Sequence, residues 1–314
     1  MKIAIDVSPL QNDNKVRGVG FYLEHLKNSL AKYFPENEYI PFVRGESLPN
    51  GVDVIHFPYF EPFFLALPIY RQYKTIVTVH DLTPIVFKSA FPTGIKGQVK
   101  WQMQRYALKQ ASAILTDSES SKKDIIKHVG VRESKVNVVY LAAGENFKVL
   151  DKSKLNAENL RNQYNLPEKF ILYVGDVTWN KNLPRFLDAV KLTKLPLVMV
   201  GKNLVSETYD KTNPWNADLN RVNELAKGDS NITRLGFIPS EDLVRIYNLA
   251  TVFAMPSLYE GFGLPILEAM SCGVPVVTTK EGSLKEVAGD AAFYVDGYDY
   301  ENIANGLTKV FNEL

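Results

Sequence analysis

Short runs of β-branched and other apolar residues alternate with stretches of helical periodicity along most of this 314-residue chain. Strands that alternate with helices pair in parallel through right-handed crossovers, so the first half predicts an α/β domain with a parallel sheet. Its expected helices include Phe21–Leu30, Lys96–Gln110 and Ser120–His128. Its expected strands are Lys2–Asp6, Val52–Phe57, Thr75–His80, Ala113–Thr116 and Val136–Leu141.

The alternation stops in a polar stretch between Gly144 and Lys169 and then begins again. A chain of this length exceeds the usual size of one hydrophobic core. We therefore expect two doubly wound Rossmann-like domains, 1–150 and 151–314, that face each other across a cleft, with ligands at the carboxyl ends of the strands. The expected strands of the second half are Phe170–Val174, Leu197–Val200, Ile232–Leu235, Thr251–Met255, Val274–Thr278 and Ala292–Val295.

The composition argues against several classes of protein. With 36 basic and 35 acidic residues, the formal net charge of +1 is too small to favour nucleic acid as a partner. The single cysteine cannot form an internal disulfide, and the four histidines show no metal-ligand spacing with it, so no metal site is expected. Met1–Asp6 reaches a charge too early for a signal peptide, and the longest uncharged run, Ile246–Tyr259, is too short to span a bilayer. We expect a cytoplasmic protein.

The most informative segment follows the expected strand Thr251–Met255 and opens a helix. Pro265 suits the first turn of a helix, and Gly273 followed by Pro275 is typical of a helix end. The helix therefore begins within a glycine-rich turn, where the backbone N–H groups of Phe262, Gly263 and Leu264 form a site suited to a phosphate. Carboxylates beside a phosphate site are suited to hydroxyl groups, so Glu260 and Glu268 are candidates to hold a sugar and a ribose.

The run Glu260-Gly-Phe-Gly-Leu-Pro-Ile-Leu-Glu268-Ala-Met resembles the signature of retaining glycosyltransferase family 4, also called glycosyl transferases group 1, which has the GT-B fold. The resemblance implies that Glu260 contacts the transferred sugar as a catalytic residue and that Glu268 contacts the ribose of the donor. Taken singly, Glu260 would be a surface loop residue and Glu268 a partner of the helix dipole; their joint setting favours the functional interpretation.

A second match to the family is Tyr173-Val-Gly-Asp-Val-Thr-Trp-Asn180-Lys181, again a strand, a glycine turn and a helix start. Lys181 can direct a compact positive charge at the donor diphosphate, which makes it a candidate catalytic and donor-binding residue. Many relatives have an arginine at the position of Asn180. Asn180 remains a candidate to bind the donor, but we expect its phosphate contact to be weaker than that of the arginine, or the contact to be supplied by another residue.

The resemblance extends to three shorter matches. Gly18 and Gly20 follow the first strand and match a glycine loop against the donor phosphate, with Arg17 as an acceptor contact. Taken alone the pattern is often only a tight turn, but its position after the first strand favours the functional loop. His80 ends a strand and is implied to contact the donor sugar near its reacting carbon. Phe237 and Ile238 match the loop whose backbone meets the base of the nucleotide.

The family resemblance implies a hexosyltransferase of mannose or glucose type that retains anomeric configuration and acts in cell-envelope polysaccharide biosynthesis. No Asp-x-Asp motif is present, so we expect a metal-independent reaction without a cofactor, in which Lys181 and the helix amides stabilise the leaving diphosphate. The donor is expected to be a GDP- or UDP-linked sugar, and the acceptor a glycan or a lipid-linked glycan.

Two other functions remain open from the sequence. A nucleotide-sugar epimerase shares the two-domain architecture, and relatives usually continue past Tyr300–Leu314 with a crossover helix, so an inactive or truncated sugar-nucleotide binder is also considered. The basic stretch 88–109, which carries Trp101 and Tyr106, predicts either a solvated amphipathic helix or a surface that contacts anionic lipid at the inner face of the membrane.

Overall fold

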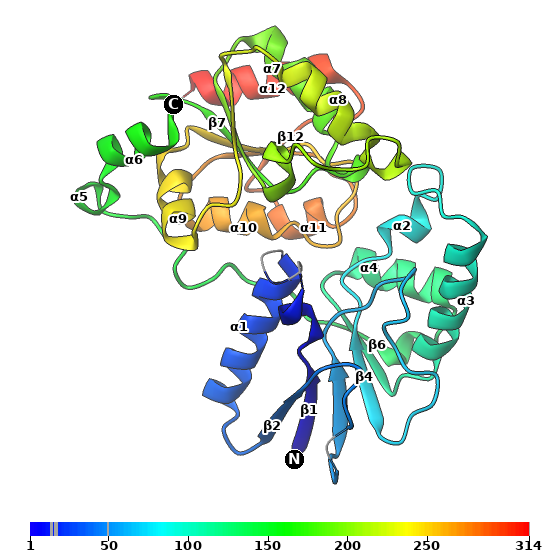
Figure 1. Cartoon of the computed structure of the whole chain (residues 1–314). Coiled ribbons are helices and arrows are strands. Elements are labelled where there is room, and N and C mark those ends of the chain that lie inside the picture. The colour runs from blue at the N-terminus through cyan, green and yellow to red at the C-terminus, as the bar shows by residue number, and fades with distance from the viewer. Residues whose placement is uncertain (13–14, 16–17, 49, 314) are drawn as a thin grey trace. The chain divides into compact units, whose positions relative to one another are not determined.

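The computed structural model describes residues 1–12, 15, 18–48 and 50–313. The chain forms two compact units, which are described separately: Met1–Lys88 with Thr93–Tyr140, and Ser89–Pro92 with Leu141–Leu314 (Figure 1). The first unit thus ends at Tyr140, earlier than the junction expected at 150. The segment that follows is fixed to the second unit, since the backbone N–H of Leu150 donates to Asn248 Oδ1 at 2.7 Å.

The first unit is built on a parallel sheet in the order β2-β1-β3-β4-β5-β6 among its described residues. Its buried strand residues alternate between two faces: Ala4 belongs to one apolar cluster and Ile5 to another. The chain adds β2 on one side of β1 and β3 on the other, so the sheet has a switch point between β1 and β3. The strands are β1 (Lys2–Asp6), β2 (Glu38–Phe42), β3 (Val54–Phe57), β4 (Lys74–Thr78), β5 (Ala113–Thr116) and β6 (Val136–Val138).

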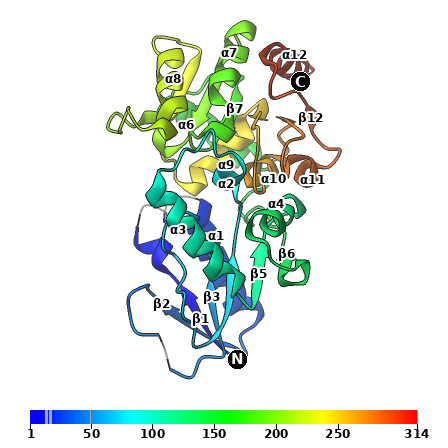
Figure 2. The same ribbon diagram turned by 90° about the vertical axis from the view of Figure 1, so that its right-hand side faces the viewer.

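Helices cover both faces of this sheet. Leu23 of α1 packs against Ile5 on one face, while Trp101 and Leu108 of α3 pack on the other. Figure 2 shows these two helices beside the strands of the first unit. The Ser118 side chain begins α4 by accepting the backbone N–H of Ser121. The helices are α1 (Gly18–Tyr33), α2 (Thr83–Val86), α3 (Ile95–Lys109) and α4 (Glu119–Asp124), with the short turns η1 (Ser8–Gln11) and η4 (Glu133–Lys135) and the π-helical turn η3 (Ile125–Val129).

The second unit contains another parallel sheet, in the order β12-β11-β10-β7-β8-β9 among the residues that the structure describes. After β7 the chain adds β8 and β9 on one side, and it then returns to add β10, β11 and β12 on the other. The switch point of this sheet therefore lies between β7 and β10. The strands are β7 (Ile171–Val174), β8 (Leu197–Val200), β9 (Ile232–Leu235), β10 (Val252–Met255), β11 (Val276–Thr278) and β12 (Phe293–Tyr294).

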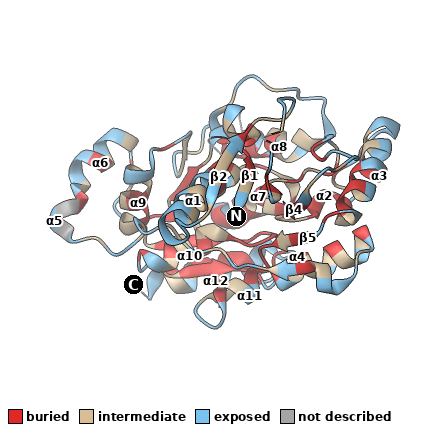
Figure 3. Cartoon of the chain, turned by 90° about the horizontal axis from the view of Figure 1, so that it is seen from below, coloured by how far each residue is buried: buried red, intermediate tan, exposed pale blue. Residues whose placement is uncertain are grey.

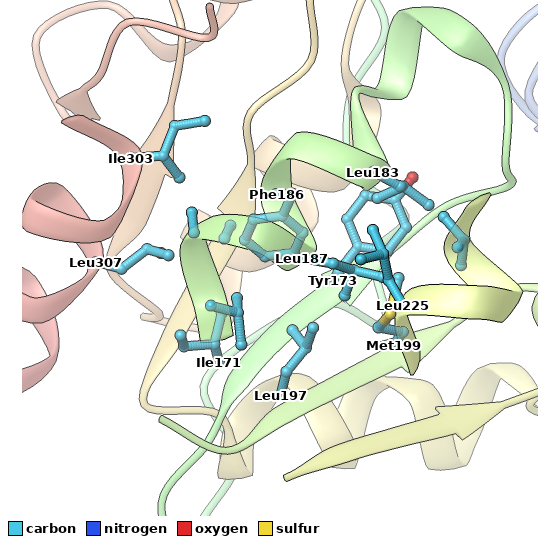
Figure 4. Packing of buried hydrophobic residues seen from close by; sticks show 14 of the residues in the cluster. Ile171, Tyr173, Leu183, Phe186, Leu187, Leu197, Met199, Leu225, Ile303 and Leu307 are labelled. Carbon is cyan, nitrogen blue, oxygen red and sulfur yellow. The ribbon is translucent and has the colours of Figure 1, made fainter. Parts of the chain in front are cut away.

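The helices of this unit form a layer on each face of its sheet, as Figure 1 shows. Figure 4 shows one face, where Phe186 and Leu187 of α7 and Leu307 of α12 pack against Ile171 and neighbouring strand residues. On that face lie α7 (Leu183–Thr193), α8 (Ala217–Ala226) and α12 (Tyr300–Asn312); on the other lie α6 (Ala157–Tyr164), α9 (Ser240–Leu249), α10 (Leu264–Ser271) and α11 (Leu284–Ala288). The remaining short elements are α5 (Lys152–Leu155), η5 (Trp179–Lys181), η6 (Lys202–Val205) and η7 (Pro214–Asn216).

The two parallel α/β sheets confirm the fold class expected from the sequence. Figure 3 shows buried residues along the strands and exposed residues on the outward faces of the helices, as amphipathic periodicity predicts. Strand β2 was not predicted, because Glu38 and Pro41 give it an atypical sequence. Its place at the edge of the sheet explains why a proline is tolerated there.

Candidate functional site

Two loops leave the carboxyl ends of β7 and β10, the strands that flank the switch point of the second sheet. In an open parallel sheet this is where ligands bind, because the loops diverge and leave room between them. The loop after β7 leads to Lys181, and the loop after β10 leads to Glu260. The topology therefore brings two predicted site residues to one place, although 79 positions separate them in the sequence.

Lys181 and Glu260 form a direct ion pair. Lys181 Nζ lies 2.8 Å from both Oε1 and Oε2 of Glu260, so the ammonium group bridges the carboxylate. The side chains are 19% and 9% exposed, which limits screening by water. A compact cation and a carboxylate are thus fixed side by side, each still able to meet a ligand at its accessible surface.

Asparagines hold the two loops together beneath this ion pair. Asn180 Nδ2 donates to the carbonyl of Tyr259 at 2.9 Å, and its Oδ1 accepts the hydroxyl of Thr178 at 2.8 Å. Asn182 Nδ2 donates to the carbonyls of Pro256 and Gly297. Asn180, expected to contact a phosphate, therefore already uses both polar atoms of its side chain within the protein, and it fixes the loop that carries Glu260.

The backbone of Glu260 is held from its other side by the turn after β11. Ser283 Oγ donates to the carbonyls of Glu260 and Phe262, at 3.0 and 2.8 Å. Gly282 has a positive φ of 58°, and a Cβ atom there would lie 2.8 Å from the backbone nitrogen and oxygen of Glu260. Only glycine allows this approach without displacing Glu260.

Helix α10 begins at Leu264, directly after the loop of Glu260, as the sequence predicted. Gly263 adopts a left-handed φ of 98° as its N-cap, and Pro265 lies in the first turn. The first N–H groups of a helix have no partner within it, and the dipole makes that end positive. Of the three residues expected to offer N–H groups to a phosphate, Gly263 and Leu264 stand at the helix start itself and Phe262 directly precedes them.

Glu268 lies one turn inside α10 and is partly buried. Tyr247 of α9 donates its hydroxyl to Glu268 Oε2 at 2.9 Å. Burial raises the pKa of Glu268 from 4.5 to about 7, against the opposing effect of the hydrogen bond from Tyr247. Near neutral pH this carboxyl group is therefore poised between its neutral and charged forms.

The two predicted site residues in the loop after β9 differ in their exposure to solvent. The side chain of Phe237 is 52% exposed, whereas Ile238 is buried in the apolar core beneath α9 and α10. A ligand can therefore reach the ring of Phe237 but only the backbone of Ile238.

His80 lies in the first unit, just past β4, and is paired with Asp117. Its Nδ1 lies 2.7 Å from Asp117 Oδ2. Burial lowers the pKa of His80, but the charge and hydrogen bond of Asp117 outweigh burial and raise the pKa above 6.5. Nε2 is also buried, and the backbone of Pro58 contributes further to the raised pKa of His80.

The glycines after β1 lie in a helix rather than in a loop. Gly18 is the first residue of α1, and Gly20 is buried in its first turn. The expected glycine loop is thus the start of α1, with Gly18 exposed and nothing within 4 Å of a Cβ atom built there. Arg17 lies outside the described residues.

Sequence reasoning missed the residues that position the site. Asp117, Tyr247, Gly282 and Ser283 act on His80, Glu268 and Glu260 from elements distant in sequence. The only signal available for them was a glycine followed by serine directly after a strand. Among the described residues, no group of three or more His, Cys, Asp and Glu side chains could hold a metal ion. A search of the same residues finds no helix with the length and apolarity needed to cross a membrane.

A separate cavity lies elsewhere in the second unit. It has a volume of about 810 Å³ and lies between the 204–211 segment and α8, lined by Lys211, Asn223 and Arg234 among others. Lys181, Glu260 and Glu268 do not line it. We assign the candidate site to the switch point, because the strand order and the ion pair of Lys181 and Glu260 both place it there. The cavity is lined by both acidic and basic side chains, which does not favour a diphosphate.

Sequence comparisons match the two halves of the chain to two descriptions. Residues 156–313 match glycosyl transferases group 1, and residues 11–142 match glycosyltransferase family 4. The serotype-specific mannosyltransferase WbdA of Escherichia coli is 32% identical over 248 residues, which are 77% of this chain and 29% of WbdA. The O-antigen chain mannosyltransferase B of E. coli is 32% identical over 245 residues, 75% of this chain and 60% of that protein. The chain spans less than two thirds of either relative.

Solved structures share the fold at lower identity. Anabaena Alr3699/HepE, in complex with UDP and glucose, has a TM-score of 0.69 and 18% identity, covering 98% of this chain and 89% of that one. WaaG, a glycosyltransferase involved in lipopolysaccharide biosynthesis, has a TM-score of 0.67 and 14% identity over 99% and 90% of the two chains. These similarities confirm the GT-B fold class.

The ion pair predicts a strong energetic coupling. We expect Lys181→Met alone to lower the free energy of unfolding by about 3 kcal/mol, because Glu260 is left as an unpaired buried charge. Adding Glu260→Gln should recover at least about 1 kcal/mol of that loss in a double-mutant cycle from urea unfolding. The exposed pair Arg221–Glu224 is the control, with coupling under about 0.5 kcal/mol. Equal coupling energies in the two pairs would contradict the prediction that the buried ion pair is strongly coupled.

The raised pKa of Glu268 predicts a pH-dependent cost to stability. The folded-state pKa of about 7 lies above the unfolded value of 4.5, so ionising Glu268 destabilises the folded chain. This cost is absent below about pH 4.5 and complete above about pH 7, where it reaches at most about 3 kcal/mol.

We therefore expect Glu268→Gln to raise the free energy of unfolding at about pH 8 and to have little effect at about pH 5. Urea unfolding at both values checks this, with Glu224→Gln, on a side chain 68% exposed, as the control. A gain that is equal at both pH values, or no gain at about pH 8, would argue against the assigned environment.

Proposed function

Because this chain belongs to the glycosyl transferases group 1 family, we propose that it moves a hexose from a nucleotide-diphosphate sugar to an acceptor hydroxyl. The observation that carries the proposal is the ion pair of Lys181 and Glu260 at the switch point, next to the start of α10. A cation and a helix N-terminus are suited to a diphosphate, and the carboxylates are suited to hydroxyl groups of sugar and ribose.

Charge development on the leaving group is the step that this arrangement supports. As the bond between the anomeric carbon and the phosphate oxygen lengthens, negative charge grows on the diphosphate and positive charge on the sugar. Lys181 and the N–H groups of Gly263 and Leu264 stabilise the negative charge on the diphosphate. Glu260, freed in part from Lys181 by the arriving diphosphate, holds a hydroxyl of the sugar. In this proposal the protein supplies the charge stabilisation that a metal ion supplies in other enzymes.

Retention of configuration follows from attack on the same face. The acceptor oxygen forms the new bond to the anomeric carbon from the side on which the phosphate departs, and the acceptor proton passes to a phosphate oxygen. Charge and protons balance without a covalent intermediate on the protein. His80, held by Asp117, contacts the donor sugar in this proposal.

The relatives narrow the substrates. WbdA and O-antigen chain mannosyltransferase B are named as mannosyltransferases, and HepE was solved with UDP and glucose. A mannose- or glucose-type donor linked to GDP or UDP is therefore proposed, with a cell-envelope glycan or a lipid-linked glycan as acceptor. The family supports transfer over epimerisation, so nucleotide sugars should not interconvert when no acceptor is present.

A panel of nucleotide sugars tests the donor site. We expect GDP-mannose or UDP-glucose to raise the melting temperature, since a ligand at 100 times its Kd adds about 2.7 kcal/mol to stability. Lys181→Ala and Glu268→Ala should lose most of this shift. Lys285→Ala is the control, because Lys285 forms an exposed ion pair with Asp290 in the same unit and should keep the shift.

Transfer itself is measured with the donor that binds. Proton NMR of the product should show the donor's anomeric configuration, and excess EDTA should leave the rate unchanged. An inverted product, a rate abolished by EDTA, or unchanged shifts in both site variants would contradict the proposed site and mechanism.

We also propose a peripheral contact with anionic membranes through α3, the helix of the basic stretch 88–109. One stripe of this helix exposes Ile95, Val99, Met103 and Tyr106, which are 36% to 81% exposed. The helix has no acidic residue, and Lys100 lies over the ring of the exposed Phe64 at 5.6 Å. Apolar side chains flanked by lysines are suited to the interface of an anionic bilayer.

Vesicle sedimentation tests this contact. Binding to vesicles with anionic lipid should fall about 30-fold in Lys96→Gln/Lys100→Gln, since each of the two lysines near such a surface contributes about 1 kcal/mol. The control Lys123→Gln/Lys127→Gln removes the same charge from another helical segment of the unit and should bind normally. Equal binding to neutral and anionic vesicles would exclude the electrostatic contact.

A further inference from the structure

Glu268 has a single hydrogen-bond donor in the described part of the chain. Its Oε2 accepts the hydroxyl of Tyr247 at 2.9 Å, while Oε1 has no hydrogen bond to any described residue. The two groups come from α9 and α10, which pack on the same face of the second sheet. One oxygen of the carboxyl group is thus fixed by the protein, and the other is left for a ligand.

Tyr247 is held too firmly to turn its hydroxyl elsewhere. It is fully buried, and its ring packs between Phe253 of β10 and Phe147, with ring centroids 5.7 Å away on each side. Burial and the nearby charge of Glu268 raise the pKa of Tyr247 well above 10, so its hydroxyl keeps its proton. Tyr247 is therefore a permanent donor aimed at Glu268.

We propose that Tyr247 is a positioning residue, which keeps Glu268 as a carboxylate with Oε1 directed at the ribose of the nucleotide sugar. This inference rests on the proposed function, since it assigns a support to the same donor site. A carboxylate accepts hydrogen bonds from two ribose hydroxyls, whereas a protonated carboxyl group has less capacity to accept. Tyr247 favours the form that the ligand needs, because its hydroxyl can donate to the charged form.

The effect of Tyr247 on the charge of Glu268 has a definite sign. Burial raises the pKa of Glu268 to about 7, and the hydrogen bond from Tyr247 lowers it. Removing the hydroxyl leaves burial unopposed, so Glu268 should take up its proton at a higher pH. Binding of a nucleotide sugar then weakens at neutral pH and recovers as the pH rises.

Few other charged groups bear on Glu268. Cys272 at the end of α10 interacts with it electrostatically, and burial raises the pKa of that thiol to about 11, so it stays neutral. Lys285 and Glu286 lie on α11, which also packs against α10, but neither is a cause of the pKa shift of Glu268, and Lys285 is paired with Asp290. Lys148 contacts Cys272 and Asn248 through its backbone.

The experiment is calorimetric titration of Tyr247→Phe with UDP-glucose and GDP-mannose between about pH 6 and pH 9. The diphosphate of these probes does not titrate in this range, and proton loss from the nucleotide base at its alkaline end affects every variant alike. A difference in pH dependence between variants therefore reports on the protein. At pH 7 we expect an affinity about tenfold below that of the unaltered chain, the size of one hydrogen bond to a charged group. At pH 9 the deficit should shrink below about threefold, and the midpoint of the pH profile should move upward.

Two variants distinguish positioning from a structural role. Tyr164→Phe removes another tyrosine hydroxyl bonded to a carboxylate, at 2.7 Å from Asp242 Oδ2 of the same helix α9, and should leave affinity and pH profile unchanged. In a Glu268→Gln background, Tyr247→Phe should cause no further pH-dependent loss, because the titrating group is absent.

The outcomes separate the two proposals. If the unaltered chain binds neither nucleotide sugar at any pH, the proposed function fails. If it binds, but Tyr247→Phe changes nothing or weakens binding equally at every pH, the donor site stands and the positioning role of Tyr247 is excluded. A pH-dependent loss of affinity in Tyr164→Phe like that expected for Tyr247→Phe would also exclude the positioning role of Tyr247.

Discussion

The ion pair between Lys181 and Glu260 joins the two loops that leave the second sheet on either side of its switch point. Each loop alone is a connection between a strand and a helix, and neither forms a site. The ion pair and the hydrogen bonds of Asn180 and Asn182 hold the loops in one arrangement. The Gly282–Ser283 turn fixes Glu260 from the opposite side. The candidate site is thus assembled by the crossover topology and not by any one segment.

Two carboxyl groups in this region are kept in different electrostatic states. Glu260 is in direct contact with a cation, whereas Glu268 has, among the residues that the structure describes, only the tyrosine hydroxyl as a donor and a pKa raised to about 7 by burial. Breaking the first arrangement is costly because it leaves an unpaired buried charge, and the second arrangement costs stability at neutral pH. A partly buried carboxyl group whose ionisation costs stability is typical of functional sites.

The fold and the signature residues could be predicted because they depend on local patterns. Alternating strands and helices specify a parallel sheet, and the glycine-rich run around Phe262 specifies a helix start. Tyr247 and Asp117 could not be predicted, because their contacts with Glu268 and His80 depend on packing between elements far apart in sequence. Strand β2 was missed because Pro41 is acceptable only at the edge position that the topology provides. Gly18 and Gly20 were expected in a loop, yet helix α1 already begins at Gly18.

The most direct test of the central claim is a crystal structure of the chain with a bound nucleotide sugar. The account predicts the diphosphate at the start of α10 within hydrogen-bond distance of Lys181 Nζ, and the ribose on Glu268 Oε1. A nucleotide bound instead in the cavity beside Arg234, or one that contacts neither Lys181 nor Glu268, would contradict it.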